Sequence, residues 1–206
     1  MIAALPHMLP PKSERVTYEA YLKRAPEGKK TNLINGVLHV DMSASSLHER
    51  VQGFLLSLLR MFVSKHKLGQ VLGSRTPVRL DEENGAEPDI LFVQADREHI
   101  IGRVGLDDAP DMVVEIISPS SRIDDRVRKF IGYEQIGVRE YWLIDPERKT
   151  AEFFRQMDTG AFAEVTPERG QPFHSEVVDG FWLDPAWLLA DELPNDYDTL
   201  QRILDA

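Results

Sequence analysis

The sequence predicts a mixed α/β protein in which one central β-sheet is flanked by helices. Short apolar runs at residues 89–93 and 112–117 are typical of buried strands. A long amphipathic helix is indicated by apolar residues spaced one or two turns apart, namely Val51, Leu55, Leu58, Leu59 and Phe62. Strand patterns that alternate with helical patterns favour helices packed on the faces of a sheet. We therefore expect one helix-flanked sheet.

The composition describes one globular domain over residues 1–206, with residues 1–15 as a loosely ordered lead-in. The chain has 42% hydrophobic and 28% charged residues, enough to close a core of its own. It has no cysteine, so disulfides, thiolate metal sites and thiol nucleophiles are excluded. Any metal must then be held by oxygen or imidazole, which points to magnesium, manganese or calcium.

Charge and hydropathy bound the location and the partners. No apolar run approaches the roughly 18 residues of a membrane span, and residues 1–6 are too short and uncharged for a secretory signal. We expect a cytoplasmic protein. The net charge of −10 argues against a protein that coats nucleic acid nonspecifically, although it leaves room for a local basic groove.

The first elements are predicted by caps and a turn. Thr17 is a suitable N-cap for a short helix that runs through Arg24. Asn35-Gly36 supplies the positive φ angles of a two-residue turn, so residues 33–40 form an N-terminal hairpin. The spacing of Ser46 and Glu49 is that of a capping box, which begins the long helix; this helix ends near Gly69.

The middle of the chain is predicted as strands. We expect one strand over residues 71–80, an acidic turn at residues 81–85 and a strand over residues 89–93. A further strand over residues 112–117 is apolar on both faces except for Glu115, which indicates a central position in the sheet.

The last part of the chain begins with a helix that starts at Asp124 or Asp125 and is ended by Gly137. Residues 140–145 and 151–155 then form a hairpin, and a C-terminal β extension of weaker strands follows. We expect a closing helix from Tyr197 to Leu204. The C-terminal residues expected to anchor the core are Phe181, Trp182, Trp187 and Leu188.

The chemical interpretation begins with Glu115. A lone ionised carboxylate in an apolar strand is costly to bury unless a cation compensates it. Asp89, at the start of the neighbouring strand, supplies a second carboxylate, and divalent cations of the magnesium class favour one or two carboxylates. Two structural alternatives stay open: Glu115 forms a buried ion pair with an arginine such as Arg126, and Asp89 belongs to a turn that precedes its strand.

A lysine would complete the site by positioning water and stabilising the anionic transition state. The residue beside Glu115 on the same face of the strand is Ile117, so the amine must come from elsewhere. Lys129, in the following helix, is the best candidate. Val127, Phe130 and Ile131 define the apolar face of that helix and Lys129 lies on another, so a solvated helix lysine is the alternative.

Other polar residues carry weaker predictions. His48 lies in the first turn of its helix, where a surface or cap-adjacent imidazole is the alternative to a catalytic base. Glu140 and Asp145 flank an apolar strand, and we expect them to fix the ends of the hairpin or to pair with arginine rather than to take part in chemistry.

Together these motifs resemble the PD-(D/E)XK restriction-endonuclease-like superfamily, in its branch of bacterial endonucleases abundant in cyanobacteria. The resemblance covers most of the chain. The strings that carry it are Asn35-Gly36, Ser45-Ser46-Leu47-His48, Pro88-Asp89, Val114-Glu115-Ile116-Ile117-Ser118-Pro119-Ser120, Asp125, Lys129, Gly137-Val138-Arg139-Glu140-Tyr141-Trp142-Leu143-Ile144-Asp145-Pro146 and Asp179-Gly180-Phe181-Trp182-Leu183.

The resemblance implies a restriction-endonuclease-like core, a four-stranded mixed sheet flanked by helices. It implies Asp89, Glu115 and Lys129 as catalytic residues and Asp89, Glu115 and the backbone carbonyl of Ile116 as ligands of magnesium or manganese. Lys129 matches a lysine moved from the strand to the helix. The remaining cleft residues that the resemblance implies are His48, Asn32 and Asp125.

One departure concerns an auxiliary acid. Members often carry a glutamate shortly before the hairpin glycine, and this chain has Asn32 at that position, while Asn35 replaces a common aspartate. An auxiliary acidic ligand is then missing, which bears on metal affinity and on a second metal.

Three functions follow as alternatives. The first is a magnesium- or manganese-dependent endonuclease acting on DNA, with a symmetric homodimer as the expected assembly. The second is a noncatalytic interaction or regulatory module that retains the nuclease fold, which the acidic composition and Asn32 favour. The third is carboxylate-only hydrolysis of a sugar, which Lys129 does not support.

Overall fold

The larger of the two main sheets has six strands. The computed structural model describes residues 11–41, 44–118, 124–168 and 170–205, with the backbone alone for 124–126. The strand order is β10-β9-β8-β7-β6-β3; β7 and β8 are parallel and the other described neighbours antiparallel. The strands are β3 (Gly69–Gly73), β6 (Ile90–Gln94), β7 (Met112–Ile116), β8 (Glu140–Asp145), β9 (Thr150–Gln156) and β10 (Phe162–Glu164).

A smaller sheet contains the N-terminal hairpin. Its order is β2-β1-β5-β4, and a separate two-stranded ladder pairs β11 with β12. These strands are β1 (Thr31–Ile34), β2 (Val37–Val40), β4 (Val78–Arg79), β5 (Gly85–Ala86), β11 (Phe173–His174) and β12 (Trp182–Leu183). The helices are η1 (Lys12–Glu14), α1 (Tyr18–Arg24), α2 (Ser46–His66), η2 (Ala95–Ile100), the π-helical η3 (Asp124–Lys129), α3 (Phe130–Ile136), α4 (Pro185–Leu189) and α5 (Asp196–Leu204).

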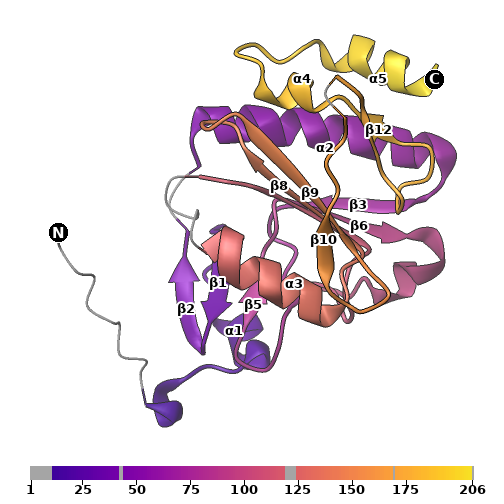
Figure 1. Cartoon of the computed structure of the whole chain (residues 1–206). Coiled ribbons are helices and arrows are strands. Elements are labelled where there is room, and N and C mark those ends of the chain that lie inside the picture. The colour runs from indigo at the N-terminus through magenta and orange to yellow at the C-terminus, as the bar shows by residue number, and fades with distance from the viewer. Residues whose placement is uncertain (1–10, 42–43, 119–123, 169, 206) are drawn as a thin grey trace.

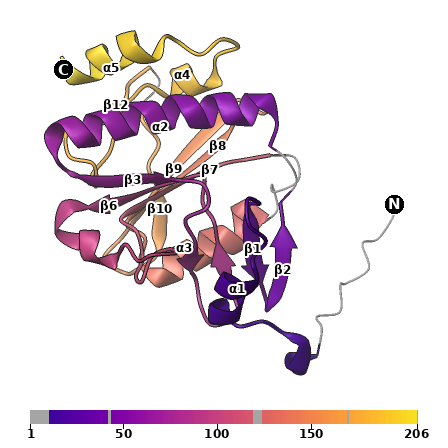
Figure 2. The ribbon, with the colours of Figure 1, turned by 180° about the vertical axis from the view of Figure 1, so that it is seen from behind.

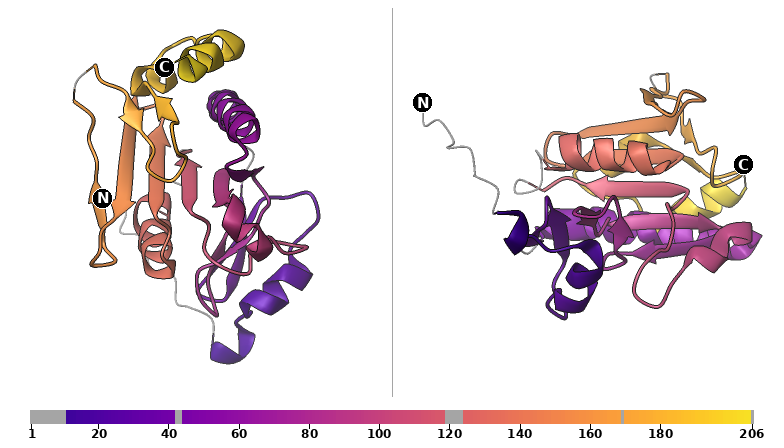
Figure 3. Two further views of the ribbon diagram at one scale, coloured as in Figure 1. Left: turned by 90° about the vertical axis from the view of Figure 1, so that its right-hand side faces the viewer. Right: turned by 90° about the horizontal axis from the view of Figure 1, so that it is seen from below.

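The six-stranded sheet is covered on both faces, as Figure 1 shows, and the two faces form two apolar clusters. Alternate residues such as Ile90 and Val114 pack with α2, which α4 and α5 cover from outside (Figure 2). The intervening residues, such as Leu91 and Val113, pack on the side of α3. Figure 3 shows the layers edge-on, with the hairpin and α1 below the sheet on the side of α3. The predicted helix-flanked mixed sheet is confirmed, although the sheet has six strands rather than the expected four.

Local signals produce several elements as predicted. Thr17 caps α1 by accepting a hydrogen bond from the backbone N–H of Ala20. Asn35 and Gly36 have φ angles of 50° and 75°, which are the left-handed values that the hairpin turn needs. Gly137 ends α3 with a φ of 90°. No helix among the described residues is long and apolar enough to cross a membrane.

The predicted strand over residues 71–80 is wrong. Residues in this range belong to β3 in one sheet and β4 in the other. The chain turns between them, where Arg75 has a φ of 75° and Pro77 lacks the N–H that a continuous strand would use.

The long helix α2 differs from the prediction at both ends. Its N-cap is Ser45, which bonds His48 N–H, and its last residue is His66.

The predicted apolar face of the helix after β7 is also wrong. Val127 and Ile131 are 51% and 46% exposed, whereas Lys129 is 4% exposed and Tyr133 is fully buried. Lys129 and Tyr133 are four residues apart and share one helical face. This face is turned toward the sheet because it meets the buried carboxylate of Glu115. Phe130 does pack on this side of the core, as expected.

Candidate active site

Two carboxylates lie side by side on adjacent strands. Ile90 pairs with Val114 in the antiparallel ladder of β6 and β7, so extending the register by one residue brings Asp89 opposite Glu115. Successive side chains of a strand alternate between faces, and both acids therefore share the face of Leu91 and Val113, on the side of α3. Each is only 1% exposed. Charges buried to this degree require cationic or hydrogen-bonding partners.

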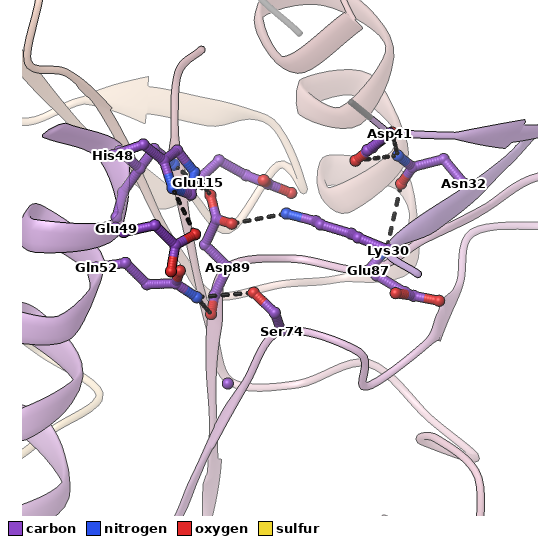
Figure 4. Close-up of polar contacts among 12 residues, drawn as sticks. Lys30, Asn32, Asp41, His48, Glu49, Gln52, Ser74, Glu87, Asp89 and Glu115 are labelled. Carbon is purple, nitrogen blue, oxygen red and sulfur yellow. Dashed lines mark hydrogen bonds and ion pairs between the residues drawn. The ribbon is translucent and has the colours of Figure 1, made fainter. Parts of the chain in front are cut away.

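The side chain of Asp89 has three hydrogen-bonding partners, of which Figure 4 shows Lys30 and His48. Its Oδ1 accepts a hydrogen bond from the Lys30 amine at 2.6 Å. Its Oδ2 accepts from the backbone N–H of Ile116 at 2.8 Å and lies 3.2 Å from Nε2 of His48. Burial alone would raise the pKa of Asp89, but the Lys30 charge and the His48 contact hold this pKa far below its ordinary value. Asp89 is therefore ionised, and one of its two carboxylate oxygens is hydrogen-bonded to a lysine.

Glu115 is held from the opposite side by the helix that follows its own strand. The Lys129 amine lies 3.0 Å from Oε1 of Glu115. The hydroxyl of Tyr133 donates to the same oxygen at 2.7 Å. Lys129 is the last residue of η3 and Tyr133 lies one turn later in α3, so consecutive helical turns present both groups.

The structure thus brings the three predicted catalytic residues into one cluster. Asp89 and Glu115 lie in adjacent strands, and Lys129 reaches Glu115 from the helix. Ile116 contributes its backbone next to Asp89 through the N–H bond described above. Ile117, which the strand period of two places on the same face as Glu115, is buried in the apolar core and contributes no polar side chain to the site.

The three predicted cleft residues differ in their placement. His48 is buried and contacts Asp89; burial lowers the pKa of this imidazole, but the bond to Asp89 outweighs burial and raises it. Asn32 is buried as well, but its amide nitrogen donates to Asp41 and its oxygen accepts from the backbone N–H of Glu87. Asp125 is described by its backbone alone, so its predicted side-chain role lies outside the described residues.

Two residues of the cluster were absent from the sequence-based prediction. Lys30 immediately precedes β1, in a polar segment with no apolar pattern. The signal that would have found it is the strand period of two, which places Lys30 on the face of Asn32, the position of the auxiliary acid. Tyr133 would have been found from Lys129, because residues four apart on a helix are neighbours.

The donor set fits a hard divalent cation. Among the residues that the structure describes, no three histidines, aspartates or glutamates are grouped in a way that could hold a metal ion. The available set is two carboxylates and the peptide of Ile116, and cations of the magnesium class use one or two carboxylates with water and substrate oxygens. The oxygen chemistry of Asp89 and Glu115 suits such a cation.

A cavity adjoins the helix side of the cluster. It has a volume of about 260 Å³ and lies between the hairpin and the helix that carries Lys129. Amides and a guanidinium line part of it, together with Lys129: Asn32, Asn35, Asn84 and Arg128. Gly132 allows the helix to lie close to the side chain of Leu80, the residue after β4, because a Cβ atom there would be 2.7 Å from Leu80 Cδ1. Apolar side chains form much of the remaining lining, and of Asp89, Glu115 and Lys129 only Lys129 borders the cavity.

Comparisons with known proteins identify the family and the fold. Residues 17–186 match the Uma2 family, described as "Putative restriction endonuclease". Among solved structures, the chain is similar to a "putative nuclease belonging to DUF820" from Anabaena variabilis ATCC 29413, with a TM-score of 0.69 and 17% sequence identity. The match covers 84% of this chain and 97% of the other, and at this identity it shows the fold alone. No curated protein matches the sequence.

Proposed function

This chain belongs to the Uma2 family, and from that premise we propose that it is a metal-dependent endonuclease that hydrolyses phosphodiester bonds of DNA. The observation that supports the proposal most is the cluster of Asp89, Glu115 and Lys129. Two buried carboxylates on one sheet face, with an amine 3.0 Å from one of them, are an arrangement suited to phosphate chemistry.

Each residue has a distinct role in this proposal. Asp89, Glu115 and the carbonyl of Ile116 would hold magnesium or manganese. When bound, such a cation neutralises charge on the phosphoryl group and lowers the pKa of water. Lys129 orients the attacking water and donates to the anionic transition state. Tyr133 fixes the carboxylate of Glu115 by its 2.7 Å hydrogen bond, so that the ligand is oriented before substrate arrives.

The proposed reaction is the hydrolysis of a phosphodiester bond. The water oxygen forms a bond to phosphorus, and one bridging P–O bond of the strand breaks. The attacking water gives up one proton to the surrounding water, and the departing oxygen takes one proton from it. The phosphate stays on one side of the nick, and the cavity between the hairpin and the helix gives the strand an approach beside Lys129.

The acidic surface has a consequence for substrate binding. The net charge is −10, so DNA must be bound by a local set of cations rather than by the surface as a whole. Arg128, which lines the cavity beside Lys129, is one such cation. We propose that the working unit is a homodimer, because two sites related by a twofold axis match the symmetry of duplex DNA. Light scattering on the purified chain measures its mass directly.

A plasmid assay tests the proposal. Supercoiled DNA is incubated with the protein in Mg²⁺, Mn²⁺ or EDTA, beside the variants Glu115→Gln and Lys129→Ala. Lys65→Ala, an exposed lysine of α2, is the matched control. We expect metal-dependent nicking by the wild type and the control, and loss of nicking in both site variants. Absence of nicking together with absence of metal binding would instead favour a noncatalytic module that retains the nuclease fold.

A further inference from the structure

The Lys30 amine is hydrogen-bonded to Oδ1 of Asp89, the oxygen with which this carboxylate would bind a metal ion. We propose that Lys30 is a resident cation that occupies Asp89 in the metal-free protein and must leave Oδ1 when a divalent cation binds, so that it lowers the metal affinity of the site. This inference rests on the proposed metal dependence and adds a residue that neither the sequence motifs nor the catalytic cluster includes.

The hydrogen bonds of Asp89 carry the argument. Oδ2 is committed to the backbone N–H of Ile116 and to His48, and both bonds fix the side chain against the sheet and α2. Oδ1 accepts from the Lys30 amine at 2.6 Å, a short charge-assisted bond. Oδ1 is therefore the oxygen that would face a metal ion, and it is the one that Lys30 covers.

Lys30 can leave without moving the backbone. Its carbonyl accepts a hydrogen bond from the N–H of Asp41, and the next residue begins β1, so the main chain is fixed. Its side chain is 22% exposed, whereas that of Asp89 is 1% exposed. A lysine side chain has four rotatable bonds. The amine therefore has a route toward solvent, while the carboxylate stays buried.

The charges of the site explain why the Lys30 ammonium and a divalent metal ion exclude one another. Asp89 and Glu115 contribute two negative charges, and Lys30 and Lys129 contribute two positive charges, so these four groups are neutral together. Burial lowers the pKa of Lys30, but the negative charges of Asp89 and Glu115 outweigh burial and raise this pKa above its ordinary value. A divalent cation added beside the Lys30 ammonium meets direct repulsion at a distance of a few ångströms.

Metal titration tests the inference. Mn²⁺ is titrated calorimetrically into the wild type, Lys30→Gln and the matched control Lys29→Gln, which removes the same charge from the adjacent exposed residue. We expect Lys30→Gln to bind Mn²⁺ at least about tenfold more tightly than the wild type, and Lys29→Gln to stay within about twofold of it. Unchanged or weaker binding by Lys30→Gln alone overturns the inference. No binding by any of the three proteins overturns the proposed function, and this inference with it.

A second measurement uses the wild type alone and so does not depend on whether the variant folds. Amines are acetylated with an N-hydroxysuccinimide ester, with and without saturating Mn²⁺, and each lysine is followed by fragment mass spectrometry. We expect acetylation of Lys30 to become at least about tenfold faster with Mn²⁺, because a competing cation breaks the ion pair, while that of Lys29 is unchanged. An equal rate at Lys30 with saturating metal contradicts the release of the amine.

Discussion

The amine of Lys129 lies 3.0 Å from Oε1 of Glu115, although one residue belongs to the helical turn η3 and the other to strand β7. Ile117, which directly follows β7 and lies two residues after Glu115, is apolar and buried in the core. The sheet therefore packs without an additional charge, and the amine is supplied by the helix that follows. Four predictions follow from this arrangement and its surroundings, each with its own measurement.

The first concerns the buried pair itself. Lys129→Met leaves Glu115 with one cation fewer, and removing one member of a buried pair costs about 3–5 kcal/mol of the free energy of unfolding. The double variant Glu115→Gln, Lys129→Met removes both charges and should recover most of that loss. Urea unfolding of the two single variants and the double variant measures the coupling free energy. Additive effects would show that the two side chains do not interact.

The second concerns Tyr133, which donates to Glu115 at 2.7 Å. Tyr133→Phe keeps the ring in the core and removes only the hydroxyl, so we expect a loss of about 1–3 kcal/mol in unfolding free energy. The affinity for Mn²⁺ should fall by about 10–100-fold, because a group that orients a metal ligand is lost. Tyr197→Phe, at an exposed tyrosine of α5, is the control. Unchanged metal affinity in Tyr133→Phe would remove Tyr133 from the site.

The third concerns His48, whose Nε2 lies 3.2 Å from Asp89. His48→Ala removes a partner that fixes Oδ2, and we expect Mn²⁺ affinity to fall about 10–100-fold. His39→Ala removes an exposed imidazole from β2 and should have no effect. Calorimetric titration compares the two. Equal affinities in both variants would assign His48 to helix capping and packing instead.

The fourth concerns Glu140, a buried acid away from the cluster of Asp89, Glu115 and Lys129. It accepts hydrogen bonds from the Trp142 indole, the Ser175 hydroxyl and the backbone N–H of Glu176, which attaches the C-terminal extension to β8. Burial raises its pKa above the ordinary value of 4.5 despite these bonds and the charge of Arg155. The role expected for Glu140 as a structural residue agrees with these contacts.

The sign of the pH effect follows from that raised pKa. The folded protein binds the Glu140 proton more tightly than the unfolded chain, so this contribution to stability is fully present below pH 4.5 and is lost as the pH rises through the folded pKa. Urea unfolding of the wild type and Glu140→Gln across this range measures it. The stability of the wild type relative to Glu140→Gln should fall as the pH rises. A difference that is constant with pH contradicts the account.

The strand residues of the site were predictable because the signals are local. The apolar runs around Asp89 and Glu115 identify strands, and the period of two places each acid on a face. The pairing of the two strands then brings the acids together. The caps at Thr17 and Gly137 and the turn at Asn35-Gly36 are equally local, since each is a conformational preference of one or two residues.

The remaining parts depend on tertiary contacts that no short pattern contains. The helix after β7 exposes Val127 and Ile131 because its polar pair, Lys129 and Tyr133, meets Glu115. Hydrophobic periodicity alone selects the opposite face. Lys30 precedes a strand of the smaller sheet, and it contacts Asp89, which precedes a strand of the larger sheet. No pattern in the segment around Lys30 predicts that contact. Buried charges thus decide positions that the apolar pattern cannot.

The most direct test of the proposed metal site is an anomalous difference map from crystals of the wild type soaked in Mn²⁺. We predict a peak between the carboxylates of Asp89 and Glu115, at about 2.0–2.6 Å from a ligand oxygen of each, with the Lys30 amine moved away from Oδ1 of Asp89. A map at saturating Mn²⁺ with no peak between these carboxylates, and with Lys30 still bound to Asp89, would contradict the account.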